Sequence, residues 1–117
     1  MASKEFIRGT IKTLVLKLLS DKKKMYGYEI SARVKELSDN EIQLTYGALY
    51  PILYKLEAEG LLSTESELVD NRARKYYSLT EKGNEVAKVK VSELENFIGI
   101  IKNILITSKT SLESWAH

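Results

Sequence analysis

The residue types best suited to contact an anionic partner gather in two short segments, residues 45–55 and 72–75. In the first segment, a step of 100° per residue along a helix separates an apolar stripe from an outward side. The outward side and the start of this segment carry Thr45, Tyr46, Gly47, Tyr50, Pro51, Tyr54 and Lys55. Glycine lets the backbone approach a phosphate, tyrosine hydroxyls donate hydrogen bonds, and lysine pairs with phosphate. The pattern predicts a surface that contacts DNA. The alternative is that the tyrosines cover the edge of the core and that the lysine is an ordinary solvated charge.

The second segment contributes three cations. In an extended strand, Arg72 and Arg74 project to one side, while Lys75 projects to the other. Two arginines on one face of a hairpin tip are suited to grip a phosphate or to enter a minor groove. The alternative is a charged hairpin whose cations only protect an exposed strand edge. Because this segment follows a candidate DNA-contacting helix, we favour DNA contact here as well.

The same sequence offers little to catalysis or metal binding. The chain has no cysteine, and its one histidine is the last residue, His117. Thiolate metal sites, disulfides and an internal histidine base are therefore unavailable. No glycine-rich phosphate loop is present, and Glu57 and Glu59 fall on different faces of one helix. We therefore expect neither an enzyme nor a bound metal or cofactor.

Length and composition indicate one compact domain. The 117 residues are 44% apolar and carry a net charge of +2, which suits a single hydrophobic core. So small a basic excess neither proves nor excludes nucleic-acid binding, because clustering on one surface is what matters. The first apolar run is interrupted by lysines, and no run of about 20 apolar residues is present. We expect a cytoplasmic protein that does not associate with membranes.

Hydrophobic spacing predicts the elements that position these residues. Apolar residues at three- and four-residue intervals indicate helices, and a change to alternation indicates strands. The expected helices cover about residues 7–19 (N-cap Ser3), 26–37, 45–59 (N-cap Thr45, with Gly60 beyond its end) and 80–108, and the expected strands cover 62–67 and 73–79 around a turn at 69–72. The expected fold is mainly α with a small two-stranded β wing: a winged helix-turn-helix followed by a C-terminal helix. In such a fold the helix over residues 45–59 enters the major groove.

The last helix carries a doubled apolar stripe. Its members recur at alternating three- and four-residue spacing and, beside these, at every seventh residue. They are Val91, Leu94, Phe97, Ile98, Ile101, Ile104, Leu105 and Leu112. A free monomer would expose this stripe to water, so we expect a homodimer that buries it against a twofold-related copy. The alternative is that the stripe packs back on the chain's own domain. A twofold dimer would place two recognition helices about 34 Å apart on a pseudo-palindromic operator.

Two aromatic residues near the C-terminus carry a separate hypothesis. Phe97 and Trp115 would line an apolar pocket between the protomers that binds a small apolar effector. The alternative for Trp115 is that a lone terminal tryptophan simply packs against the chain or frays.

Four blocks of residues, taken together and in this order, resemble the PadR family of bacterial transcriptional regulators. The blocks are residues 26–30 (YGYEI), 47–53 (GALYPIL), 56–61 (LEAEGL) and 74–83 (RKYYSLTEKG). The tail is similar to the family's short branch, which has a single C-terminal helix.

This resemblance implies a winged-helix DNA-binding domain over residues 1–79 and a C-terminal dimerisation helix over residues 80–117. It also implies a dimeric repressor of transcription that leaves its operator on double-stranded DNA when an effector binds. The positions that match the family's DNA-facing helix and wing are Tyr50, Lys55, Arg72, Arg74 and Lys75.

Two other functions remain open from the sequence. The same fold can serve as a winged-helix protein–protein interaction module without DNA binding. The two readings differ in salt dependence, because DNA affinity falls steeply with salt through counterion release. A constitutive DNA-binding protein without any effector is a further alternative.

Overall fold

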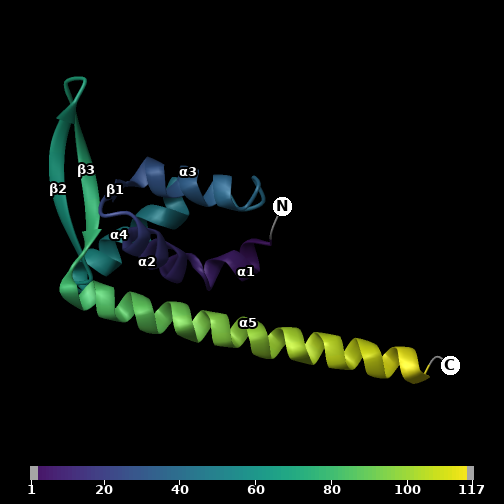
Figure 1. Cartoon of the computed structure of the whole chain (residues 1–117). Coiled ribbons are helices and arrows are strands. Elements are labelled where there is room, and N and C mark those ends of the chain that lie inside the picture. Colours follow the sequence, from purple (N-terminus) through teal and green to yellow (C-terminus); the bar gives the residue numbers. More distant parts are fainter. Residues whose placement is uncertain (1–2, 116–117) are drawn as a thin grey trace.

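The computed structural model describes residues 3–115 of the chain, with side chains through residue 106. The elements, in order, are α1 (Lys4–Arg8), α2 (Ile11–Asp21), β1 (Met25–Tyr26), α3 (Gly27–Leu37), α4 (Tyr46–Ala58), β2 (Leu62–Val69), β3 (Arg72–Leu79) and α5 (Glu81–Trp115). Figure 1 shows a body of short helices, from which the β2–β3 hairpin and the long α5 extend in different directions. This order confirms the expected mainly helical fold with a β wing.

The first expected helix is two helices in the structure. Ser3 caps α1 as predicted, because its side chain accepts a hydrogen bond from the Glu5 amide. The chain then turns at Gly9, and both the backbone amide and the hydroxyl of Thr10 donate to the Ile7 carbonyl at 2.8 Å. These local bonds compete with helix continuation, and glycine is a weak helix former. The prediction of one uninterrupted helix is therefore wrong.

The expected boundaries of α4 are confirmed. Thr45 is its N-cap, with the hydroxyl accepting from the Ala48 amide at 3.2 Å. At the other end, Gly60 has φ +78° and donates to the Glu57 carbonyl, while the next amide reaches the Leu56 carbonyl at 2.9 Å. This is the double hydrogen-bond pattern of a glycine-terminated helix.

The wing is a hairpin with a two-residue turn. Asp70 and Asn71 have φ of 50° and 62°, the left-handed conformations that a tight turn with the correct twist requires. A third strand, β1, pairs with β3 through Met25↔Tyr77 and Tyr26↔Tyr76, so the sheet order is β1-β3-β2. The predicted two-stranded wing is thus a three-stranded sheet. The strand β1 has only two residues, which is too short for an alternating pattern to reveal it in the sequence. Its pairing depends on backbone hydrogen bonds to β3, which is distant in sequence.

The hydrophobic core lies between α2, α3, α4 and the base of the sheet. Its fully buried side chains include Val15, Leu16, Ile30, Leu49, Leu53, Leu56 and Tyr77. The start of α5 packs against α2, and Ala87 near this end of the helix is part of the core. Gly83 lies so close to this core that a Cβ built on it would stand 1.9 Å from the Leu61 carbonyl oxygen.

The helix α5 is continuous over 35 residues, including Gly99. Ala87 near its start is buried, Val91 and Leu94 are half-buried, and the described side chains from Glu95 onward are exposed. The helix therefore packs on the body over its first part and projects beyond it, which lengthens the molecule to 68 × 28 × 21 Å (Figure 1). Among the described helices, none has the length and apolar character needed to cross a membrane.

Candidate nucleic-acid interface

The outward surface of α4 is largely as the helical period predicts. Tyr46 and Tyr54 are 59% and 55% exposed. The other exposed members of the predicted set are Thr45, Gly47, Pro51 and Lys55. The Thr45 hydroxyl already accepts the helix-capping bond, so only its proton is free to donate to a phosphate. The surface is a row of aromatic and small residues with one cation.

Tyr50 is placed differently from the expectation that it points outward. The side chain is half-buried, and its ring lies between those of Tyr46 and Tyr54, with centroids 5.4 Å and 5.9 Å away. Its hydroxyl end rests against Gly27, where an added Cβ would stand 2.2 Å from the oxygen. Burial, and then the neighbouring tyrosines, raise the pKa of the Tyr50 phenol. A residue at the border between the buried and outward faces can tilt inward when a glycine leaves room.

Three further tyrosines, which the sequence-based prediction missed, belong to the same region. Tyr28 is 58% exposed at the start of α3, and its ring stacks on Tyr26 at 6.2 Å. Tyr26 in turn meets Tyr76 of β3 edge-on at 5.5 Å. About fifty residues separate Tyr26 from Tyr76 in sequence, so no local pattern could have joined them. The short spacing of Tyr26 and Tyr28 around a glycine was the only available signal.

Cations lie on these rings along one face of the wing. The Arg74 guanidinium lies 4.5 Å from the Tyr26 ring centroid, and the Lys24 ammonium lies 5.0 Å from that of Tyr76. Lys24 also pairs with Glu65 at 3.2 Å and with Glu67. Hydrogen bonds to these two carboxylates raise the pKa of Lys24. Arg74 and Lys24 are therefore held in place by the wing and by the start of α3.

The other face of the wing approaches α4. Lys75 donates to Glu57 at 3.4 Å, and its ammonium lies 5.5 Å from the Tyr54 ring centroid. Burial alone would lower the pKa of Lys75, but the facing Tyr77 and Glu57 outweigh it and raise the pKa. Arg72, beside the turn, is exposed and has no ion-pair partner among the described residues. Of the predicted wing cations, Arg74 and Lys75 thus have partners, whereas Arg72 has no ion-pair partner among the described residues.

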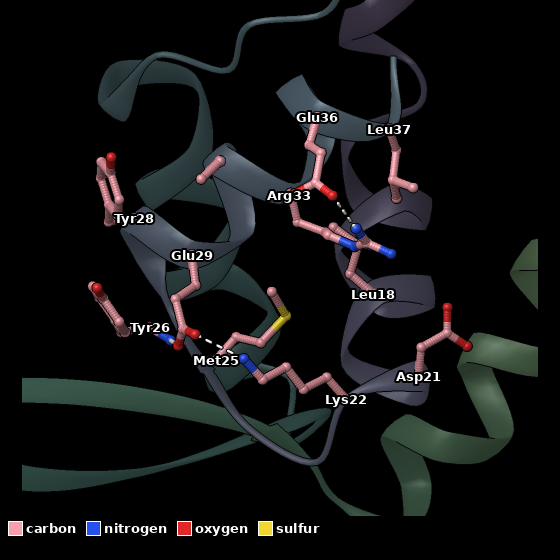
Figure 2. A pocket seen from close by; sticks show the side chains of 11 residues that line it. Leu18, Asp21, Lys22, Met25, Tyr26, Tyr28, Glu29, Arg33, Glu36 and Leu37 are labelled. Carbon is pink, nitrogen blue, oxygen red and sulfur yellow. Dashed lines mark hydrogen bonds and ion pairs between the residues drawn. The ribbon is translucent and has the colours of Figure 1, made fainter. Parts of the chain in front are cut away.

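A hollow of about 500 Å³ opens behind this region, between the end of α2, β1 and α3. Figure 2 shows two ion pairs among its side chains, Lys22 with Glu29 and Arg33 with Glu36, and the charged groups of each pair lie 2.8 Å apart. Burial would raise the pKa of Glu29, but the bonds from Lys22 and from the Tyr26 amide lower it. The Tyr26 amide bond to Glu29, 3.2 Å long, also caps α3. The Lys22–Glu29 pair holds the start of α3 in place, and no described cluster of three histidine, cysteine or acidic residues is arranged for a metal ion.

The candidate dimer residues fall into three groups. Val91 and Leu94 are half-buried against the chain's own body. Exposed on α5 are Phe97, Ile98, Ile101, Ile104 and Leu105. Leu112 lies outside the residues whose side chains are described, as does the candidate effector residue Trp115. Phe97, the other effector candidate, is 57% exposed and borders a shallow apolar hollow of about 540 Å³.

Comparisons with known proteins agree with this architecture. The model of the Transcriptional regulator PadR-like family matches residues 15–89. A transcriptional regulator of Mycobacterium tuberculosis is 36% identical over 80 residues, which are 68% of this chain and 71% of the relative. A solved transcriptional regulator from Clostridium thermocellum has a TM-score of 0.78 and 29% identity, covering 88% of this chain and 97% of its own. A solved PadR family transcriptional regulator from Eggerthella lenta has a TM-score of 0.69 and 34% identity, over 86% of each chain.

The family match spans α4, the whole wing and the start of α5, and it includes all four blocks of residues that resemble the family. Members of this family are DNA-binding regulators of transcription and not enzymes. The chain belongs to the PadR-like family of transcriptional regulators.

Proposed function

We propose that this protein binds duplex DNA sequence-specifically, with α4 in the major groove and the wing beside it. The observation that carries the proposal is that α4, with its exposed outward face, and the wing, which bears Arg72, Arg74 and Lys75, are joined side by side through Lys75 and Glu57. An α-helix fits the major groove, and a neighbouring hairpin can follow the backbone or the minor groove. Tyr46, Tyr54 and Lys55 would then meet base edges and phosphates.

The working form in this proposal is a homodimer. The apolar side of α5 from Phe97 to Leu105 is not covered by any of the described side chains, and burying it against a second copy is the simplest arrangement that removes it from water. Residues 1–79 would bind DNA, and residues 80–117 would hold the two protomers together. A twofold axis then places two copies of α4 on a pseudo-palindromic operator, about one helical turn apart.

The regulatory direction we propose is repression that ends when a small apolar effector binds. The apolar hollow beside Phe97 and Ile101 supports this, because pairing of two copies would enclose it and create a pocket between protomers. An effector that fits only one arrangement of the two protomers would shift the spacing of the recognition helices.

Fluorescence anisotropy tests the DNA part of the proposal. Labelled duplex from upstream of the protein's own gene is titrated with the protein at several salt concentrations, with random duplex as the control. The proposal expects tighter binding to the upstream duplex and an affinity that falls steeply as salt rises. Binding to neither duplex would contradict it.

One observation favours the alternative of a protein-interaction module. The wing carries three carboxylates, Glu65, Glu67 and Asp70, against its three cations, so its net charge offers no general attraction to a polyanion. Salt separates the two functions, because a largely apolar protein interface keeps its affinity at salt concentrations that release DNA.

A further inference from the structure

One carboxylate on the recognition helix holds both strands of the wing. Glu57 stands in the last turn of α4, half-buried. Its Oε1 accepts from the Lys75 ammonium of β3 at 3.4 Å, and its Oε2 accepts from the Thr64 hydroxyl of β2 at 3.2 Å. The strand register places Thr64 and Lys75 on the same face of the hairpin, since Thr64 pairs with Tyr77 and alternate residues share a face.

The opposite face of the wing is also held. Lys24 pairs there with Glu65 and Glu67, and β1 pairs with β3 no further along than Tyr76. Beyond Tyr76 the hairpin continues to Arg72 without a third strand beside it, as Figure 1 shows. The wing is therefore held on both faces to beyond the middle of its strands, through Lys75 on one face and Glu67 on the other, and only its tip projects past these contacts.

A small tilt of the wing at these contacts displaces its tip. Arg72 lies three residues beyond Lys75, or roughly 10 Å at about 3.3 Å per residue. A tilt of about 10° at Lys75 would move Arg72 by roughly 2 Å, enough to break a charge-assisted hydrogen bond to phosphate. The position of Arg72 relative to α4 therefore depends on the contacts at Glu57.

We propose that Glu57 is a positioning residue that sets the discrimination between operator and random DNA. This inference rests on the proposed function. Glu57 fixes the wing relative to α4, so that base contacts by the helix and phosphate contacts by Arg72 are made together only on a matching duplex. Its negative charge also repels phosphates, so it lowers affinity for DNA of any sequence while it raises selectivity.

Glu57→Gln tests this directly, because it removes the charge and keeps the shape. The wild type first selects its preferred duplex from a random-sequence library, and the affinities of both proteins for that duplex and for random duplex are then measured. We expect random-duplex affinity to rise and the ratio of selected to random affinity to fall about fivefold. Fivefold corresponds to the upper range of one exposed ion pair, when loosening reduces the population of the competent wing position.

Glu59→Gln is the matched control. Glu59 is the C-cap of the same helix and is exposed, and its carboxylate pairs with Lys12 at 3.8 Å and not with the wing. The variant makes the same change in net charge as Glu57→Gln. Because it removes no contact with the wing, it should leave the affinity ratio unchanged. An equal fall in the ratio for both variants would overturn the positioning role in favour of a general charge effect.

Thr64→Val separates the positioning effect of Glu57 from the effect of its charge. It removes one hydrogen bond to Glu57 with no change in charge, and we expect the ratio to fall about twofold with random-duplex affinity unchanged. The double variant should be no worse than Glu57→Gln alone, since both changes act on one contact. Additive losses would instead mean that Glu57 reads a base itself, and would overturn the inference.

Hydrogen exchange of the free protein separates this inference from the proposed function. Without DNA, Glu57→Gln should speed amide exchange in residues 64–75 relative to wild type, while Glu59→Gln should not. If Glu57→Gln exchanges faster but the wild type selects no duplex, the proposed DNA recognition is contradicted, whereas the contact between Glu57 and the wing is supported. Unchanged exchange and an unchanged affinity ratio would overturn the role of Glu57.

Discussion

At the scale of single residues, the surroundings of the wing cations decide what each can do. Arg74 and Lys75 already have aromatic or carboxylate partners in the free chain, so a phosphate must compete with these. Arg72 has no ion-pair partner among the described residues and stands beside the turn. We therefore assign the most direct phosphate contact of the wing to Arg72.

Arg72→Ala should weaken binding to operator and random duplex alike and should reduce the slope of log affinity against log salt by roughly one unit, since one phosphate contact is lost. Anisotropy titrations at four or more salt concentrations measure the slope. Lys88→Ala is the matched control. It removes the same charge from α5, outside the wing, where Lys88 forms an exposed ion pair with Glu85, and it should leave the slope unchanged. A slope that is equal in wild type and Arg72→Ala would reject the phosphate contact.

Periodicity predicted the exposed residues of α4 because a helix fixes the direction of each side chain. It placed Gly47, Pro51, Tyr54 and Lys55 on the solvent side, where the structure has them. It misjudged Tyr50, whose position depends on the missing side chain of a residue in another helix. The contacts of Tyr26 and Lys24 with the wing could not be predicted from local spacing either. Both depend on residues distant in sequence, which come close only when β1 pairs with β3.

At the scale of elements, two glycines in α5 have opposite surroundings. A Cβ on Gly83 would overlap the Leu61 carbonyl oxygen, whereas nothing lies within 4 Å of a Cβ on Gly99. The first glycine is required by the close approach of α5 to the end of α4, and the second only weakens an exposed stretch of helix.

Gly83→Ala should therefore lower the free energy of unfolding by about 1–3 kcal/mol, the usual cost of overpacking a rigid site. Gly99→Ala is the matched variant on the same helix and should raise it by about 0.5–1 kcal/mol, because alanine favours the helix over glycine. Urea unfolding followed by circular dichroism at fixed protein concentration measures both. Equal effects of the two substitutions would contradict the close packing of Gly83.

Capping and turn chemistry made several elements predictable in detail. Thr45 and Gly60 mark the two ends of α4, and Asp70 and Asn71 form the turn of the wing, as their residue types indicate. The break between α1 and α2 was missed because the apolar spacing runs through it, and the deciding bonds are those of Thr10 to a neighbouring carbonyl.

At the scale of the whole molecule, the exposed apolar side of α5 is the surface on which the proposed dimer depends. Ile101 lies in the middle of the apolar side, and Asn103 lies on the opposite side by the helical step of 100° per residue. Both side chains are exposed in the single chain, so a substitution at either should leave the fold of the body intact.

Ile101→Asp should convert the dimer to a monomer, because it places a charge in the proposed interface. Asn103→Asp introduces the same carboxylate on the far side of α5 and should remain dimeric. Sedimentation velocity distinguishes the two states at micromolar concentration. An Ile101→Asp variant that sediments as a dimer would refute this interface.

A dimer of the proposed kind places two copies of α4 on one duplex, and hydroxyl-radical footprinting tests this most directly. The duplex is the one that wild-type protein selects from a random-sequence library. We expect two protected half-sites about 10 base pairs apart, on one face of the helix, together with flanking protection where the wings lie. A single protected segment, or uniform cleavage at protein concentrations that saturate the duplex, would contradict a dimeric, sequence-specific DNA-binding regulator.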